Sequence, residues 1–369
     1  MKTKKIFTVL GARPQFIKAS AVSAAIAASG RLTEVVAHTG QHFDANMSDV
    51  FFPELDMETP TYHFNIHGGG HGQMTGRMLI EIEKVLLEEQ PDAVLVYGDT
   101  NSTLAGALAA TKLHIPIAHV EAGLRSFNMA MPEEVNRIVT DRISQWLFTP
   151  TEAAGAHLLR EGVSGDRIHC CGDVMFDVAL EYGSRVGAHG GVLQRLGREH
   201  GIKPGAYCLV TVHRAENTDH PARLAVIVEA LAGFARHTPV VWPLHPRTRG
   251  VLARQGRLEA LARAVTLVDP LGYLDMVQLE KHAALIATDS GGVQKEAFFY
   301  RVPCVTLRDE TEWTELVETG WNRLAPPLEL GAVLTALRAG LGTTGQEVAP
   351  YGNGDAAQRI VERLAGDLT

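Results

Sequence analysis

The feature that most constrains this fold is a repeated alternation of short apolar runs with longer helical patterns. In the first half, the predicted strands cover residues 5–10, 34–38, 93–97 and 115–120. In the second half, they cover residues 208–212, 240–244, 265–268, 284–287 and 304–307. Strands that alternate with helices form parallel sheets covered by helices on both faces. The sequence therefore predicts an α/β fold with two Rossmann-like, doubly wound parallel sheets.

Helical periodicity is clearest in two segments of the first half. One helix is predicted over residues 75–89, and its apolar face holds Met78, Ile82, Val85 and Leu86. Another is predicted to begin near Pro132, with an apolar face of Val135, Ile138 and Val139.

The length of 369 residues suits two domains, since single cores stop growing near about 250–300 residues. We predict a first domain over residues 1–182 and a second over 206–354. Residues 183–205 are rich in Gly, Arg and His and lack sustained periodicity, so they are the predicted linker. Two domains imply a cleft between them.

Charge and composition exclude several function classes. The net charge of −8 argues against a nucleic-acid-binding face, which needs clustered Lys and Arg. No stretch reaches the roughly 18 unbroken apolar residues of a membrane helix. The four cysteines have no C-x-x-C spacing, so neither a disulfide framework nor a zinc knot is expected, and a cytoplasmic location fits.

Ligands of doubly wound sheets bind beyond the carboxyl ends of the strands, so polar residues there are candidates for chemistry. In the first half, three carboxylates lie at or just beyond such ends, namely Asp99, Glu121 and Glu133. They are suited to proton transfer. Asp99 is equally compatible with a helix cap, and Glu133 with a first-turn glutamate that interacts with the helix dipole.

The first strand–helix junction carries two cations, Arg13 and Lys18, on either side of Pro14. They can pair with a phosphate or a carboxylate, although ordinary surface charge explains them equally well. The junction lacks G-x-G-x-x-G, which argues against a nicotinamide or flavin cofactor.

In the second half, His213 directly follows a strand, where it can donate a proton or bind phosphate; a lone histidine is more often structural. Asp289-Ser290-Gly291-Gly292 runs from a strand into a helix whose N-terminus can receive a diphosphate. The alternative there is a tight turn capped by Ser290. Glu296 in the same helix can accept hydrogen bonds from a ribose. His67 and His71 lack carboxylate ligands nearby, so no metal is expected.

Five motifs together resemble the non-hydrolysing UDP-N-acetylglucosamine 2-epimerase family along nearly the whole chain. They are Gly11-Ala12-Arg13-Pro14-Gln15-Phe16-Ile17-Lys18, Tyr97-Gly98-Asp99-Thr100, His119-Val120-Glu121-Ala122-Gly123-Leu124-Arg125, Pro132-Glu133-Glu134-Val135-Asn136-Arg137 and Asp289-Ser290-Gly291-Gly292-Val293-Gln294-Lys295-Glu296. The resemblance implies a glycosyltransferase-B type fold with the active site in the interdomain cleft, a homodimer, and no cofactor. It also implies that residues 355–369 form a C-terminal helix returning to the first domain.

The resemblance further implies roles for individual residues. Asp99, Glu121 and Glu133 become acid–base carboxylates, and His213 becomes an essential histidine. The residues implied around UDP are Arg13, Lys18, His245, Ser290, Gly291, Gly292 and Glu296. The reaction implied is inversion of carbon 2 of a UDP-linked 2-acetamido sugar through a 2-acetamidoglycal.

Departures from the family pattern bear on the substrate. This chain has Ala12 and Gln15 where the glucosamine enzymes usually have Thr and Glu, and Trp313-Thr314 where they have Arg-Pro. It resembles the branch that acts on UDP-2,3-diacetamido-2,3-dideoxyglucuronic acid and makes the mannuronic isomer for O-antigen, a lipopolysaccharide component. The candidate partners for the extra carboxylate of a uronate are Arg125, Arg137, Arg247 and Arg249.

Other functions stay open at this point. UDP-GlcNAc is the alternative substrate. A glycosyltransferase-B transferase, a hydrolysing relative and a noncatalytic sugar-nucleotide sensor are the alternative classes. The three carboxylates favour epimerisation over the transferase and the sensor, whereas only analysis of the products separates it from the hydrolysing relative.

Overall fold

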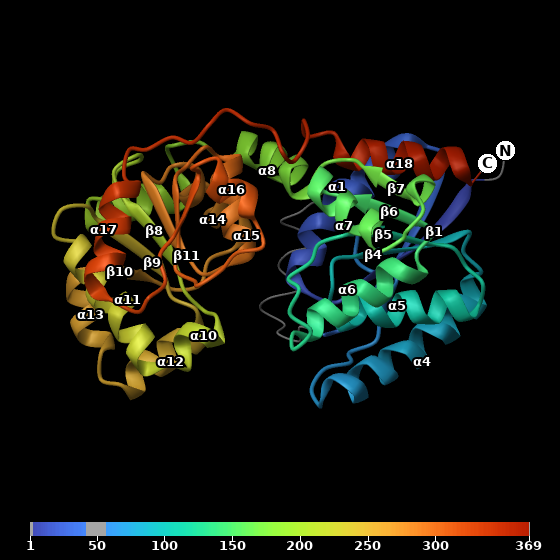
Figure 1. The fold of residues 1–369 in the computed structure, drawn as a ribbon, viewed down its shortest axis with the longest axis horizontal. Helices are drawn as coiled ribbons and strands as arrows, with labels where there is room; N and C mark the ends of the chain where they lie inside the picture. Colours follow the sequence, from blue (N-terminus) through green and yellow to red (C-terminus); the bar gives the residue numbers. More distant parts are fainter. Residues whose placement is uncertain (1–2, 42–56, 369) are drawn as a thin grey trace. The chain divides into compact units, whose positions relative to one another are not determined.

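The computed structural model describes residues 3–41 and 57–368, and the chain divides into two compact units. Unit 1 comprises residues 1–178 together with 349–369, and unit 2 comprises residues 179–348. Each unit is an α/β layer structure in which helices cover a central sheet (Figure 1). The predicted fold class is confirmed.

The sheet of unit 1 has seven strands in the order β3-β2-β1-β4-β5-β6-β7, and all its pairs are parallel. Its strands are β1 (Lys4–Leu10), β2 (Leu32–His38), β3 (Tyr62–His63), β4 (Ala93–Tyr97), β5 (Ile117–Val120), β6 (Trp146–Thr149) and β7 (Ile168–Cys170). Its helices are α1 (Arg13–Ser29), α4 (His71–Glu89), α5 (Asn101–Lys112), α6 (Pro132–Ile143), α7 (Glu152–Arg160) and α18 (Ala356–Asp367), with the short 3-10 helix η1 (Gly165–Arg167). Helix α8 (Val174–Arg185) spans the division between the units.

The sheet of unit 2 has six parallel strands in the order β10-β9-β8-β11-β12-β13. Its strands are β8 (Cys208–Thr211), β9 (Val240–Pro243), β10 (Thr266–Val268), β11 (Leu285–Thr288), β12 (Cys304–Thr306) and β13 (Asn322–Leu324). Its helices are α9 (Gly191–His200), α10 (Ala215–Thr218), α11 (Pro221–Phe234), α12 (Pro246–Arg254), α13 (Leu258–Ala264), α14 (Tyr273–Lys281), α15 (Gly291–Phe299), α16 (Thr314–Glu318) and α17 (Leu330–Gly340).

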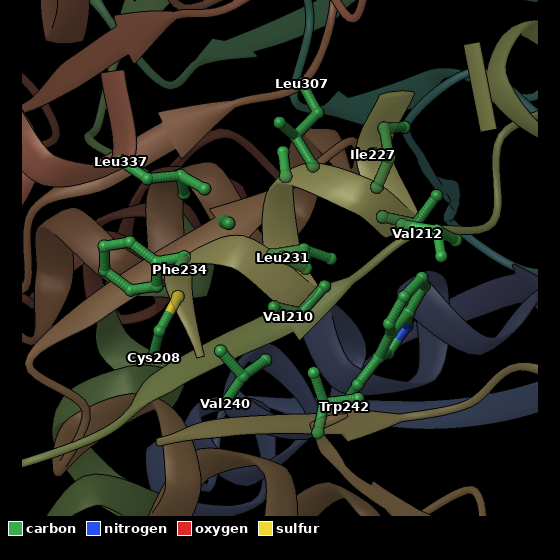
Figure 2. Close-up of a cluster of buried hydrophobic side chains, with 14 of the residues drawn as sticks. Cys208, Val210, Val212, Ile227, Leu231, Phe234, Val240, Trp242, Leu307 and Leu337 are labelled. Carbon is green, nitrogen blue, oxygen red and sulfur yellow. The ribbon is translucent and has the colours of Figure 1, made fainter. Parts of the chain in front are cut away.

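The central strands are apolar throughout because both faces of a parallel sheet are covered. All five residues of β4 are buried. In unit 2, residues of β8 and β9 pack with Leu231 and Phe234 of α11 and with Leu337 of α17 (Figure 2). Trp242 is the largest side chain of this core and is fully buried, so Trp242→Ala should destabilise unit 2 by about 3–5 kcal/mol.

The turn after β1 is tightly packed against the side chains of neighbouring elements. A Cβ atom on Gly11 would lie 2.0 Å from Ser102 Oγ, so no larger residue fits there without a shift. Next to it, Gln15 Oε1 accepts hydrogen bonds from the N–H groups of Gly11 (2.8 Å) and Ala12 (3.0 Å). Its Nε2 donates to Tyr97 O (2.7 Å), so the starts of α1 and α5 are tied to one side chain.

Helix α6 does not pack through the face that its apolar pattern predicts. The expected face of Val135, Ile138 and Val139 is not the buried one, and Val135 is 39% exposed. The helix instead buries five polar residues, namely Glu134, Asn136, Arg137, Thr140 and Asp141. The prediction was wrong because ion pairs and hydrogen bonds satisfy the four charged and amide side chains of this face, and periodicity of apolar residues alone does not detect such pairing.

Residues 183–205, the expected linker, contain helix α9 and belong to unit 2. Val192, Leu193 and Leu196 of α9 are buried beside Tyr207 and Leu279. Their spacing of three and four residues is the helical signal, which the many Gly, Arg and His residues around it obscure.

The last helix, α18, is part of unit 1 and lies beside α1, red against dark blue in Figure 1. Arg31 donates to Ala365 O (2.9 Å), and Trp146 Nε1 donates to Asp367 Oδ2 (2.7 Å). These contacts join α18 to the turn after α1 and to β6.

Candidate functional site

In unit 1, Asp99 and Glu121 lie at neighbouring strand ends. Strands β4 and β5 pair in parallel with Tyr97 opposite Val120, so the residues that follow them emerge at the same edge of the sheet. Glu121 has a φ of 71°, a left-handed backbone that is unusual for a residue with a side chain. Such strained residues concentrate at functional sites.

Glu121 is ion-paired with Lys18 of α1, and both side chains are largely buried. A Cβ atom on Gly98, whose φ is 60°, would lie 3.2 Å from Glu121 Oε2 and 3.6 Å from Lys18 Nζ. Glycine at this turn leaves room for the pair. The sequence predicts that Lys18 pairs with a phosphate or a carboxylate, and in the structure it pairs with the carboxylate of Glu121.

Asp99 accepts two hydrogen bonds from the guanidinium of Arg137 at 3.1 Å (Nε) and 2.5 Å (Nη2). Its side chain is still 30% exposed. Burial raises the pKa of Asp99, and the charge of Glu121 adds to this effect, while Arg137 and Lys18 oppose it. A carboxyl group with a raised pKa is suited to both accepting and donating a proton.

The third predicted carboxylate, Glu133, makes no direct contact with the other two. Glu133 is exposed on the first turn of α6, and among the described residues no hydrogen bond or ion pair joins it to Asp99 or Glu121. Its neighbour Glu134 is the buried one, bonded to Arg137 at 2.8 Å.

His119 is a further residue of this edge, and no role for it is predicted from the sequence. It is fully buried, and its Nε2 lies 2.7 Å from Gly98 O, to which it donates. Its Nδ1 lies 2.7 Å from Asp141, which also binds Arg125 at 2.7 Å. His119 thus anchors the turn that carries Asp99. Its place in the strand motif before Glu121 was the available signal.

In unit 2, Asp289 organises the strand ends. It is fully buried after β11, and its carboxylate accepts hydrogen bonds from the backbone N–H groups of His213 (3.0 Å) and Arg214 (3.0 Å) and from Asn217 Nδ2 (3.1 Å). These three hydrogen bonds hold the turn after β8. From the sequence, Asp289 is recognised only as the first residue of the motif before α15.

That turn presents the His213 ring, which is 42% exposed. Its Nδ1 lies 3.7 Å from Asp289, and its ring centroid lies 5.6 Å from that of His245. Burial lowers the pKa of His213, and the Asp289 charge acts against that shift. His245 caps the N-terminus of α12, where its Nδ1 accepts from Arg247 N at 3.2 Å.

Helix α15 begins at Gly291, directly after Ser290. The Ser290 side chain makes no capping hydrogen bond, so the capped turn offered as the alternative is not what forms. Trp313 Nε1 donates to Gly291 O (2.9 Å), and Lys295 lies 4.3 Å from the Trp313 ring centroid. Glu296 is buried in the same helix.

All four arginines offered for a uronate carboxylate are bound to protein carboxylates. Arg125 pairs with Asp141 and Glu161, and Arg137 with Asp99 and Glu134. Arg247 pairs with Asp219 and Arg249 with Asp269, at 2.7 and 2.8 Å. The last two pairs are more open to solvent, so either arginine can change partner at a smaller cost.

The described part of the chain has neither a metal-binding cluster nor a membrane-spanning helix. Over residues 3–41 and 57–368, no group of three or more His, Cys, Asp and Glu side chains is placed to hold a metal. Within the same ranges, no helix has the length and apolar character needed to cross a bilayer.

Comparison with known proteins gives a consistent result. A family model described as UDP-N-acetylglucosamine 2-epimerase matches residues 24–365. The UDP-2,3-diacetamido-2,3-dideoxy-D-glucuronate 2-epimerase of Pseudomonas aeruginosa is 54% identical over 98% of this chain and 99% of its own. The UDP-N-acetylglucosamine 2-epimerase of Methanocaldococcus jannaschii is 43% identical over 98% of both chains.

Solved structures agree. The M. jannaschii enzyme in complex with UDP-GlcNAc and UDP superimposes with a TM-score of 0.88 and 43% identity, over 98% of this chain and 99% of that one. The Neisseria meningitidis UDP-GlcNAc 2-epimerase bound to UDP-GlcNAc gives a TM-score of 0.88 at 30% identity, over 98% and 100%. This chain therefore belongs to the UDP-N-acetylglucosamine 2-epimerase family.

Proposed function

We propose that this protein is a non-hydrolysing epimerase that inverts carbon 2 of UDP-2,3-diacetamido-2,3-dideoxyglucuronic acid. The observation that carries the proposal is the pair of carboxylates at the ends of β4 and β5, each bound to its own cation, in a chain of this family. The 54% identity to the P. aeruginosa enzyme supports the choice of substrate.

The chemistry explains why two acid–base groups are needed. Carbon 2 of a 2-acetamido sugar is not next to a carbonyl, so its C–H bond breaks together with the bond between carbon 1 and the diphosphate. A carboxylate takes the proton, UDP leaves with the electron pair, and a 2-acetamidoglycal forms. A carboxylic acid then protonates carbon 2 from the other face, and UDP adds back to carbon 1.

The residues of unit 1 are proposed for the proton transfers. Asp99 and Glu121 lie at one sheet edge, and their neighbours Arg137 and Lys18 stabilise the ionised forms. Glu133 is the third member of the proposed acid–base set. Its side chain at the start of α6 is exposed, so it is accessible to a substrate that binds from solvent.

The residues of unit 2 are proposed to hold UDP. The N-terminus of α15 at Ser290, Gly291 and Gly292 offers backbone N–H groups and a positive dipole end to the diphosphate. His213 and His245 present adjacent imidazoles, and Arg13 of unit 1 is a further proposed cation. Glu296 is proposed to accept from the ribose.

A second candidate substrate is UDP-GlcNAc. The M. jannaschii enzyme, named for that substrate, is 43% identical over nearly the whole chain. The resemblance also implies a homodimer in the cytoplasm. Light scattering of the purified protein and fractionation of cells test these two parts of the proposal.

Proton NMR in D2O tests the reaction directly. The protein is offered each of the two UDP-sugars in turn, and deuterium at carbon 2 and the manno isomer are followed. Exchange with only the uronate supports the proposed substrate, whereas exchange with only UDP-GlcNAc selects the second candidate. Absence of exchange with both, from folded protein, refutes the epimerase proposal.

Variants assign the carboxylates. Asp99→Asn and Glu121→Gln should each lower turnover about 10²-fold or more, because each removes a general acid–base group. Glu88→Gln, on the exposed side of α4, is the matched control and should keep normal turnover. Near-normal rates in both site variants would contradict the assigned roles.

A further inference from the structure

Glu134 is a buried carboxylate outside the proposed acid–base set, and it joins two parts of unit 1. Its side chain is about 1% exposed. One oxygen accepts from Phe127 N (2.9 Å), and the other accepts from Ser126 N (2.9 Å) and Arg137 Nη1 (2.8 Å). A buried charge is tolerated only with such partners, so the ionised Glu134 side chain depends on these three hydrogen bonds.

Arg137 bridges Glu134 and Asp99. It donates from Nη1 to Glu134 and from Nε and Nη2 to Asp99, while only 8% of its side chain is exposed. Asn136, next to it on α6, donates to Asp99 O at 2.9 Å and fixes the backbone of the same residue. Both the carboxylate and the main chain of Asp99 are therefore held from α6.

The other end of this network is a loop held in an unusual conformation. Phe127 has a φ of 57° and is 74% exposed. A left-handed backbone is unfavourable for an aromatic residue, so other contacts must stabilise it here. The two hydrogen bonds to Glu134 hold that conformation. Residues 126–131 are thus connected to Asp99 through two buried charged side chains.

The electrostatic consequence has a definite sign. The charged groups around Asp99 are Arg137 and Glu134 from α6, Glu121 after β5 and Lys18 from α1. Arg137 stabilises the ionised form of Asp99, and the negative charge of Glu134 on its far side offsets part of that stabilisation. Removing the charge of Arg137 should therefore raise the proton affinity of Asp99, and removing the charge of Glu134 should lower it.

We propose that Glu134 and Arg137 are positioning residues for Asp99: together they set its orientation and its proton affinity, and Glu134 ties this setting to loop 126–131. The role in turnover rests on the proposed function, in which Asp99 exchanges a proton with carbon 2. The electrostatic part can be measured without substrate.

The experiment compares three variants of the full-length protein. Glu134→Gln removes the offsetting charge, so the pKa of Asp99 should fall by about 0.5–1 unit, and Arg137→Gln removes the stabilising charge, so it should rise by about 1 unit. Glu161→Gln is the matched control, because Glu161 pairs with Arg125 and not with this network. It should leave the pKa of Asp99 unchanged.

Carbon-13 NMR of protein labelled at the Asp carboxyl carbons gives this pKa, with Asp99→Asn assigning the resonance. Opposite shifts in the two variants support the inference, and the pH-rate profile should move in the same direction as each shift. A common direction or no shift, in variants with native circular dichroism, overturns it. A structural role alone would change stability without this pair of opposite shifts.

Arg137→Lys keeps the charge and loses the two-pronged contact, so it provides a measurement if Glu134→Gln fails to fold. The pKa of Asp99 should stay within about 0.5 unit of wild type, while kcat falls about 10-fold or more and KM changes little. A large pKa shift or unchanged kcat would contradict the positioning role. Failure of wild-type protein to epimerise refutes the proposed function separately, because the titration needs no turnover.

Discussion

Asp177 makes the stability of unit 1 depend on pH in a direction opposite to that of most carboxylates. It lies in α8 and accepts a hydrogen bond from Ala357 N (2.7 Å) at the start of α18. Burial raises its pKa to about 6, although the N–H groups of Ala357 and Ala356 act against that shift. We therefore predict that Asp177→Asn stabilises the protein at neutral pH.

The sign follows from linkage between protonation and folding. The folded pKa lies above the unfolded value of about 3.9, so the folded state binds the proton more tightly. This contribution to stability is complete below about pH 4 and is lost as the pH rises through about 6. A shift of about 2 units corresponds to at most about 3 kcal/mol, which partial exposure of the side chain reduces to about 1–2 kcal/mol.

Asparagine keeps an oxygen that accepts from Ala357 N and carries no charge. At pH 8 the variant should be more stable than wild type by about 1–2 kcal/mol, and at pH 4.5 the difference should approach zero. Urea unfolding at several pH values, followed by hydrogen exchange in α18, measures both limits. A pH-independent difference, or a loss of stability at pH 8, would refute the reasoning.

The control is Asp166→Asn, the same substitution in the same unit at an exposed carboxyl. The Ser164 hydroxyl lowers the pKa of Asp166. Replacing it should therefore not stabilise the protein at any pH.

Three further predictions follow from single contacts. Gln15→Glu places an acceptor against the β4 carbonyl that Nε2 now donates to, and should cost about 1–3 kcal/mol in urea unfolding. Gly172→Ala should cost at least about 2 kcal/mol by thermal unfolding, because its φ is 93° and its Cβ would lie 2.7 Å from Tyr351 O. Gly162→Ala, at a φ of 78° with open space around the Cβ, measures the cost of the backbone strain without the clash. Asp289→Asn should cost about 2–4 kcal/mol and weaken UDP binding measured by calorimetry, since buried N–H donors lose their charged acceptor. Unchanged stability in any of the three would contradict its contact.

The sequence predicts the sheets well because continuous apolar runs such as residues 93–97 belong to strands buried on both faces. Parallel pairing then places Asp99 and Glu121 at one edge without further information. Four short strands are not predicted, since a few residues give too little periodicity. They are Tyr62–His63, Trp146–Thr149, Ile168–Cys170 and Asn322–Leu324.

Side-chain pairing within the site is what the sequence does not reveal. Glu133 and Glu134 are adjacent in one motif, and only the packing of α6 decides that the second is buried. The pairing of Lys18 with Glu121 joins residues 103 positions apart, through a turn in which Gly98 leaves room. Such contacts depend on the rotation of each helix about its axis, which charged residues at helical spacing do not signal by themselves.

The nested connectivity of the units has a consequence for how the chain folds during synthesis. Unit 2 is inserted into unit 1, because residues 349–369 return to pack with the first 178. Domains generally fold as units while the chain grows from its N-terminus. The surface of unit 1 on which α18 packs therefore stays uncovered until all of unit 2 has been synthesised. Unit 1 is thus the first of the two to be synthesised in part and the last to be completed.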